Sequence, residues 1–375
     1  MMNVAAGPRL SDRQRLNWLR LIRTPNIGPA SFRDLINRFG SAETAIEMLP
    51  ELMRSGGARR SAHVPSIAQA EAEMETARKF GARFIGVGEA DYPPALRRIE
   101  NPPPLLAVKG SSTVFTPTPV AIVGARNASL TGVKMARMLA TDLGRDGCVV
   151  VSGLARGIDT AAHQASLPTG TIGVLAGGLD RIYPPENVGL CEEIAKNGGA
   201  LVSEMPFGWE PRAQDFPRHN RLIAGIALGL VVVEAALRSG SLISARLAGE
   251  MGRLVFAVPG SPLDPRAAGT NGLLKDGATL VTNARDIAEA FAPLAGMRQE
   301  PSSSLQEPPD FAAAHPPADD DRARVVEALG PAPVAVDDLV RHTGLHPAQL
   351  FMILLELDLA GRLERHSGGA VSLHA

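Results

Sequence analysis

The chain has 375 residues, enough for two or three domains, and its 45% hydrophobic and 21% charged content is typical of a globular protein. A formal net charge of −1 excludes a grossly basic protein, so any binding to nucleic acid must come from local clusters of cations. The sequence has no run of about 18 apolar residues and no apolar signal segment, which predicts a cytoplasmic protein without a membrane span.

Residues 1–82 are predicted to form a small helical domain. Ile27, Gly28 and Pro29 interrupt the helical periodicity, which then resumes, and this resembles a helix-hairpin-helix unit of the sterile-alpha-motif-like type. Backbone N–H groups at such a hairpin can contact DNA phosphates, and residues 1–90 hold 13 Lys and Arg against 9 Asp and Glu. A plain helical bundle that only packs is the alternative.

Residues 83–295 are predicted to form an extended Rossmann-like domain of the α/β class. Two candidate strands, ARFIGVG and PPPLLAVKG, would extend a main sheet whose strands alternate with helices from Val120 onward. Near-continuous apolar strands of this kind indicate a mostly parallel, doubly wound sheet covered on both faces. The strands are expected at VAIVG, CVVVSG, TIGVLAG, ALVSE, LVVVEA, LVFAVPG and ATLV.

The C-terminal part is predicted to consist of a linker at 296–318 and a winged-helix domain at 319–375. This domain has five arginines against nine acidic residues, and its third helix, within HPAQLFMILLELDLAG, has no Lys or Arg. Because phosphate would be repelled, we expect the domain to meet a protein partner or the chain itself rather than DNA. A domain that only packs is the alternative.

The strand-end turns of the predicted sheet are rich in Gly and Ser and lead into helices. In a parallel sheet such turns gather at one edge, where helix N-termini offer N–H groups to anions, so phosphate is the first ligand to consider. The turn Gly124-Ala125-Arg126 has Arg where a dinucleotide-binding turn needs its second glycine. We therefore expect no dinucleotide and no other cofactor.

Several side chains in these turns suit a chain of phosphates. Arg126 could hold a phosphate with its fork of donors or lie flat against a base, and Phe216 offers a face for stacking. Asp159 is more simply a cap or a first-turn charge, and His163 is a packed or capping histidine rather than a base. The candidate binding residues are Gly124, Arg126, Asn127, Ser152, Gly153, Arg156, Phe216, Arg218, Asn220, Arg221, Ser239, Gly240 and Ser241.

The sequence offers little support for catalysis or a metal site. It has no nucleophile elbow, no HExxH motif, no carboxylate cluster and no Walker motif. Cys148 and Cys191 lack zinc or redox spacing and are predicted to be small buried hydrophobic residues. We predict a binding protein with no catalytic residue.

Seven motifs, in order along the chain, resemble the DNA-processing protein A family, also called Smf. They are VGARNASLTG, VVSGLARGIDTAAHQASL, GGLDRIYPPEN, SEMPFG, FPRHNRLIAG, VVVEAALRSGSLISARLAGEMGR and VFAVPG. The resemblance covers roughly residues 10–290, and the winged helix is similar to an accessory domain of many members. It implies a homodimer, joined through the Rossmann-like domain, that binds single-stranded DNA and helps load the RecA recombinase in natural transformation.

One departure and one rival reading accompany this resemblance. Many members are expected to carry a lysine where this chain has Pro185 and Glu186, so the cationic pocket would depend more on arginines. A related enzyme family, the nucleotide phosphoribohydrolases, uses PGGxGTxxE with a catalytic Glu. Ser244 stands at that position here, and a hydroxyl cannot replace the carboxylate as a base.

Overall fold

The structure is a computed structural model that describes residues 9–58, 63–295 and 317–374. These residues form two compact units, each described here by itself. The first holds the sheet and its helices from Ala72 onward, and the second combines the N-terminal helices with the C-terminal domain. The linker predicted at 296–318 lies outside the described residues except for Pro317 and Ala318.

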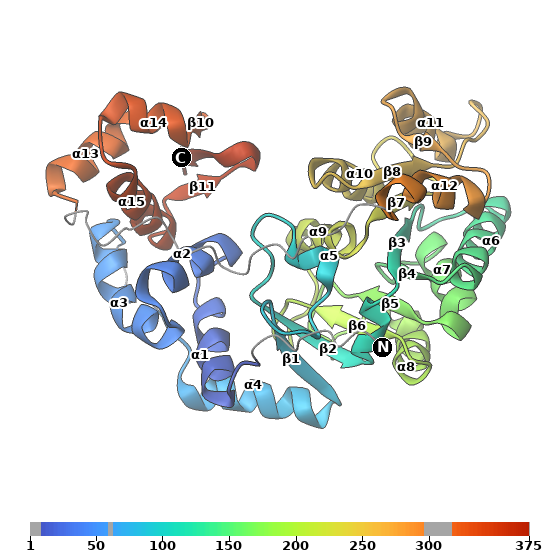
Figure 1. Cartoon of the computed structure of the whole chain (residues 1–375), viewed down its shortest axis with the longest axis horizontal. Helices are drawn as coiled ribbons and strands as arrows, with labels where there is room; N and C mark the ends of the chain where they lie inside the picture. Colours follow the sequence, from blue (N-terminus) through green and yellow to red (C-terminus); the bar gives the residue numbers. More distant parts are fainter. Residues whose placement is uncertain (1–8, 59–62, 296–316, 375) are drawn as a thin grey trace. The chain divides into compact units, whose positions relative to one another are not determined.

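A nine-stranded sheet is the centre of the first unit (Figure 1), and its strand order is β1-β2-β6-β5-β4-β3-β7-β8-β9. The seven strands from β6 to β9 in this order pair in parallel, whereas β1 and β2 are antiparallel additions at one edge. The mostly parallel sheet is therefore confirmed. The strands are β1 (Ala82–Gly86), β2 (Leu105–Gly110), β3 (Thr118–Val123), β4 (Cys148–Ser152), β5 (Thr171–Val174), β6 (Ala200–Ser203), β7 (Gly229–Val232), β8 (Leu254–Ala257) and β9 (Thr279–Leu280).

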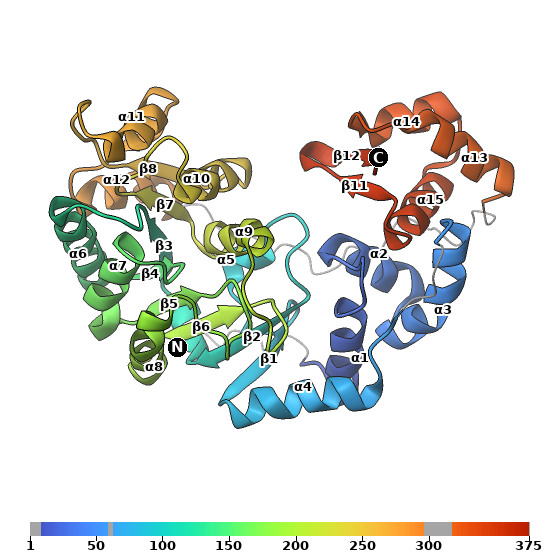
Figure 2. The ribbon, with the colours of Figure 1, turned by 180° about the vertical axis from the view of Figure 1, so that it is seen from behind.

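Helices cover both faces of this sheet. Alternate residues of each strand point to opposite faces, and two apolar clusters result, one under α6, α7 and α12 and the other under α5, α9 and α10. Figure 2 shows α6 and α7 lying side by side. The helices are α5 (Pro94–Arg97), α6 (Leu130–Arg145), α7 (Ile158–Ser166), α8 (Val188–Lys196), α9 (Phe216–Ile226), α10 (Gly240–Glu250), α11 (Ala268–Lys275) and α12 (Ala284–Ala295). The 3₁₀ turns are η1 (Ser112–Phe115), η2 (Leu167–Thr169), η3 (Pro185–Asn187), η4 (Ala213–Asp215) and η5 (Pro265–Ala267).

The strand order reverses at β3. This strand pairs with β4 on one side and with β7 on the other, and later strands continue outward in both directions. In an open parallel sheet such a reversal leaves a crevice at the carboxyl ends of the strands, because the following helices depart to opposite faces. The turns after β3, β4 and β7 therefore border one crevice.

The second unit contains two sets of helices. Four N-terminal helices begin it, and a winged helix with the antiparallel sheet β10-β12-β11 completes it, as the sequence predicts. The N-terminal helices are α1 (Asp12–Ile22), α2 (Pro29–Phe39), α3 (Ala42–Ser55) and α4 (Ile67–Lys79), the last of which runs on into the first unit. The winged helix is α13 (Asp319–Ala328), β10 (Val334–Ala335), α14 (Val336–Thr343), α15 (Pro347–Leu359), β11 (Leu363–Arg365), η7 (Ser367–Gly369) and β12 (Ala370–Leu373).

Helix α15 belongs to both sets. Its residues Leu350, Ile353 and Leu354 pack in the core of the winged helix. Met352, Leu355 and Leu359 pack instead with the N-terminal helices. The helix that a winged-helix protein usually places in a DNA groove is thus buried on two sides, and the expected self-contact of this domain is confirmed.

Candidate nucleic-acid interface

A cavity of about 640 Å³ opens where the strand order reverses. The turns after β3, β4 and β7 contribute to its wall, together with the first turns of α9 and α10. Ten of the thirteen candidate residues line it: Gly124, Arg126, Asn127, Gly153, Arg156, Phe216, Asn220, Ser239, Gly240 and Ser241. Segments more than a hundred residues apart therefore meet at one site.

Three candidate residues do not line the cavity. Ser152 is fully buried, and its hydroxyl donates to the Ile122 carbonyl at 2.6 Å. Arg221 forms an ion pair with Glu204 at 3.0 Å and donates to the Asn101 carbonyl at 2.9 Å, so it ties the end of β6 to an earlier loop. Arg218 is exposed outside the cavity wall. The position of these residues in the sequence, at the end of β4 or in the first turns of α9, does not show which way their side chains point.

Arg126 and Phe216 form the cationic and aromatic part of the wall. The guanidinium carbon of Arg126 lies 5.2 Å from the centroid of the Phe216 ring, within range of a cation–π contact. In the described part of the chain no carboxylate pairs with Arg126, so its donors face the cavity uncompensated. Both expected uses of this side chain, against a phosphate or against a base, fit this position.

Asp159 holds the turn after β4 in place. Its carboxylate accepts from the backbone N–H groups of Gly153 at 3.2 Å and Ala155 at 3.3 Å. Burial raises the pKa of Asp159 to about 7, against the opposing effect of these hydrogen bonds. Asp159 thus lies in the first turn of α7, as expected. Its hydrogen bonds, however, hold the turn that precedes this helix. They also occupy the N–H of Gly153, a residue that we expected to contact phosphate.

Glycine at two positions lets these turns approach their neighbours closely. A Cβ at Gly153 would lie 2.6 Å from the His219 ring, and one at Gly124 would lie 2.7 Å from Ile158. Both glycines are therefore needed for packing as well as for access to the cavity.

The two histidines near the cavity are buried and neutral. His163 contacts the Thr171 hydroxyl at 2.9 Å, and burial lowers its pKa to about 4, which confirms a packed histidine. His219 lines the cavity, and its Nε2 lies 2.9 Å from the Val174 carbonyl, which requires a proton on that nitrogen. Burial lowers the pKa of His219, so its Nδ1 faces its surroundings as an acceptor.

The positive charge of Arg156 is balanced by Glu186, the residue at which this chain departs from the family pattern. Its Nε donates to the Glu186 carboxylate at 2.8 Å, and both side chains are more than half exposed. An anion at this side of the cavity must therefore compete with Glu186.

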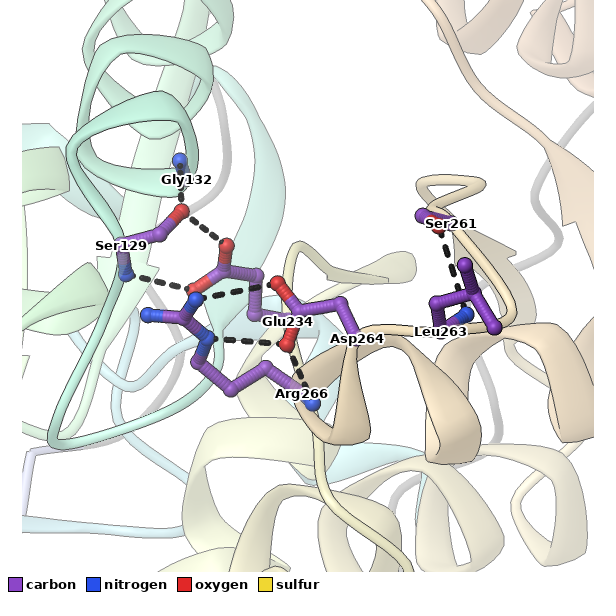
Figure 3. A network of polar contacts seen from close by, with 7 residues as sticks. All are labelled: Ser129, Gly132, Glu234, Ser261, Leu263, Asp264 and Arg266. Carbon is purple, nitrogen blue, oxygen red and sulfur yellow. Dashed lines mark hydrogen bonds and ion pairs between the residues drawn. The ribbon is translucent and has the colours of Figure 1, made fainter.

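A network around Glu234 fixes the start of α6 beside the cavity (Figure 3). The Glu234 carboxylate accepts from the Ser129 backbone N–H at 2.9 Å and from the Ser129 hydroxyl, which in turn caps Gly132. Asp264 binds Arg266 through two side-chain hydrogen bonds of 3.0 Å. Glu234 and Asp264 thus position the helix start and orient Arg266 at the cavity wall.

The sequence reasoning missed several lining residues. Tyr183, which is 52% exposed, and Arg238 lie within motifs that were already identified, so their aromatic and cationic character was the available signal. Arg266 lies in η5, which belongs to no motif, and no sequence signal pointed to it. Ser244 lines the cavity and is buried, with its hydroxyl where the enzyme family has a carboxylate.

Comparison with protein families decides the relationship. A model described as DNA recombination-mediator protein A matches residues 83–292, which is more than half of the chain. The chain belongs to the DNA recombination-mediator protein A family. Models of the N-terminal helix-hairpin-helix domain and of the winged-helix domain of this family match residues 12–76 and 307–369.

Known members of the mediator family resemble this chain over most of its length. Protein Smf of Escherichia coli is 38% identical over 285 residues, which is 75% of each protein. The structure of DNA processing protein A from Streptococcus pneumoniae matches with a TM-score of 0.61 and 31% identity, covering 75% of this chain and 98% of that one. The corresponding Helicobacter pylori protein, described by its single-stranded DNA binding mode, matches with a TM-score of 0.50 and 33% identity, covering 53% and 92%.

Two features are absent from the described residues of this mediator-family chain. Among the described residues, no group of three or more His, Cys, Asp or Glu side chains is placed to hold a metal ion. In the same part of the chain, no helix is both long and apolar enough to cross a membrane.

The raised pKa of Asp159 predicts a pH-dependent stability. Its pKa is higher in the folded state than the ordinary value of 3.8, so its contribution to stability is present in acid and is lost as pH rises toward 7. Relative to Asp159→Asn, the wild type should therefore lose on the order of a few kcal/mol of unfolding free energy between about pH 4 and pH 7 and then stay level. Urea unfolding at a series of pH values measures this difference. Asp146→Asn, at an exposed carboxylate, is the control, and a constant wild-type-to-D159N difference would contradict the prediction.

Proposed function

We propose that this protein binds single-stranded DNA in the cavity at the strand-order reversal and helps load the RecA recombinase in natural transformation or recombination. The observation that carries the proposal is the convergence of Arg126, Phe216 and the N-terminus of α10 on one cavity. The single-stranded DNA binding mode named for the Helicobacter pylori relative supports the ligand. The RecA partner rests on the family resemblance alone.

The composition of the wall favours a sugar-phosphate chain with an unpaired base. Arginines and the α10 N-terminus suit phosphates, because they supply charge and N–H donors. At that terminus Ser239 caps the helix through the Ser241 N–H, and both side chains line the cavity. Phe216 and Tyr183 offer aromatic faces to a base, and stacking does not depend on sequence.

A binding role explains the cavity better than the rival phosphoribohydrolase activity does. Within the described residues, Asp159 is the one carboxylate lining the cavity, and the two N–H groups of the turn hold it. The buried Ser244 hydroxyl cannot act as the missing base. We therefore propose that the protein is not an enzyme. Its cytoplasmic location remains a prediction from the sequence.

Replacing Arg126 with Ala should weaken binding to a single-stranded oligonucleotide by about 1 to 3 kcal/mol, because a charge-assisted contact is lost. Binding should be salt-sensitive and largely independent of sequence. A mobility-shift or fluorescence titration with single-stranded and blunt duplex oligonucleotides of equal length tests this.

Arg137→Ala is the matched control, since it removes the same charge from the exposed side of α6. Equal or tighter binding of the wild type to duplex would count against the proposal. An Arg126→Ala variant that melts would show that this residue is structural.

Replacing Glu186 with Gln should strengthen single-strand binding about twofold to fivefold, because it releases Arg156 from an exposed ion pair that solvent screens. Glu192→Gln makes the same charge change on α8, where Glu192 pairs with Lys196, and should have little effect. Equal gains for the two variants would mean that net charge alone, and not the release of Arg156, sets the affinity.

We propose that the protein is a homodimer joined along the β9 edge of the sheet. Among the described strands β9 pairs with β8 alone, and Leu280 is 50% exposed on it, whereas the next residue, Val281, is fully buried. Leu280→Asp should lower the mass measured by light scattering at tens of micromolar to that of a monomer, while Leu130→Asp, at a leucine that is 90% exposed, should not. A monomeric wild type would refute the dimer.

A further inference from the structure

The N-terminal hairpin and the winged helix meet through complementary polar groups. Helix α2 follows the hairpin, and Gly28 at its start has no side chain to cap it. The Asp358 carboxylate of α15 lies at this point, where it forms a hydrogen bond with the Ser31 side chain. An anion from the winged helix thus lies at the helix start that follows the hairpin.

Two further donors of the N-terminal helices face acceptors of α15. The Asn26 amide donates to the Leu359 carbonyl at 3.2 Å, at the C-terminal end of α15. Arg38 is exposed, and the charge of Glu356 acts on its guanidinium, although both Glu356 oxygens accept hydrogen bonds from Arg322 of α13. At these positions the donors lie on the N-terminal side and the acceptors on the winged-helix side, and the same donors could contact DNA phosphates. The bonds of Arg362 and Arg365 run in the opposite direction.

Arg365 forms bonds with both the winged helix and the N-terminal helices. Its Nε donates to Asp358 at 2.9 Å, and its Nη2 pairs with Asp34 of α2 at 3.1 Å. Arg362 adds a hydrogen bond of 3.2 Å to the Gly56 carbonyl at the end of α3. These bonds border the apolar contact between Leu355 and the N-terminal core.

The electrostatics of this contact suggest a function beyond packing. Burial raises the pKa of Asp358, so keeping that carboxylate charged costs free energy that an apolar residue would not. The N-terminal 90 residues carry more cations than anions, and the winged helix carries nearly twice as many anions as cations. An acidic domain therefore covers a basic one.

We propose that the winged helix is an autoinhibitory cover of the N-terminal helices. Asp358 and the carbonyl end of α15 occupy donors that would otherwise hold DNA phosphates. The N-terminal domain binds DNA only after the Arg365 contacts open. This second DNA contact is separate from the cavity.

The test uses the full chain carrying Arg126→Ala, so that binding in the cavity is weakened, and a blunt duplex oligonucleotide as the probe. Arg365→Asp places a third carboxylate beside Asp34 and Asp358 and should open the cover. Duplex affinity should then rise about tenfold, which corresponds to roughly 1.4 kcal/mol. The substitution makes the protein more acidic, so a general charge effect would lower the affinity instead.

Two companion variants make the result specific. The reversed pair Asp34→Arg with Arg365→Asp restores the attraction and should return affinity to the starting level. Arg341→Asp makes the same charge change on α14, at a residue that pairs within its own helix, and should give no gain. Hydrogen exchange of α2 and α15 reports whether the cover has opened.

The proposal would be overturned by a variant in which α2 and α15 lose protection from hydrogen exchange but the affinity for duplex DNA does not rise. If Arg365→Asp leaves the hydrogen-exchange protection of α2 and α15 unchanged, Leu355→Asp is the second variant to test. It should open the contact because it places a charge in the apolar part of the interface. Absence of a gain in that variant, with both sets of helices still folded by circular dichroism, would equally refute it.

Discussion

The candidate site depends on one buried carboxylate. Asp159 accepts from the N–H groups of Gly153 and Ala155 in the turn after β4, and it also has a backbone hydrogen bond with Gly124 in the turn after β3. Without this anchor the two turns at the strand-order reversal would be ordinary surface loops, and the cavity between them would have no fixed wall. Fixing the turn in this way costs free energy, because the Asp159 carboxylate is buried. The raised pKa of Asp159 reflects that cost.

The cavity also shows how a nearly neutral protein can attract a polyanion. The sheet domain has equal numbers of cationic and acidic residues between 119 and 290, yet the acidic ones are distributed unequally. Glu204 and Asp264 compensate arginines that orient loops, while Arg126 stays unpaired among the described residues and faces the cavity. Local placement, rather than net charge, makes the site electropositive.

Much of this architecture could be predicted from the sequence, because strand and turn patterns are local. The seven sheet strands from Val120 onward and the gathering of their turns follow from apolar runs that end in Gly and Ser. The directions of single side chains could not be predicted in this way. Ser152 points into the core and Arg221 toward Glu204, since partners distant in sequence decide both orientations. The sharing of α15 between two domains was likewise invisible, because an apolar helix shows that it is buried but not against what.

The position of α15 also matters for how the chain is made. Asn26 and its partner Leu359 are 333 residues apart, so the N-terminal helices leave the ribosome long before the helix that completes their core. At roughly 5 to 20 residues per second, synthesis of the intervening chain takes on the order of tens of seconds. During that time Ile27 and Leu52, which later pack against α15, lack part of their final cover. The earliest domain to emerge is therefore the last to mature, and a nascent chain exposes an apolar surface that chaperones can bind until translation ends.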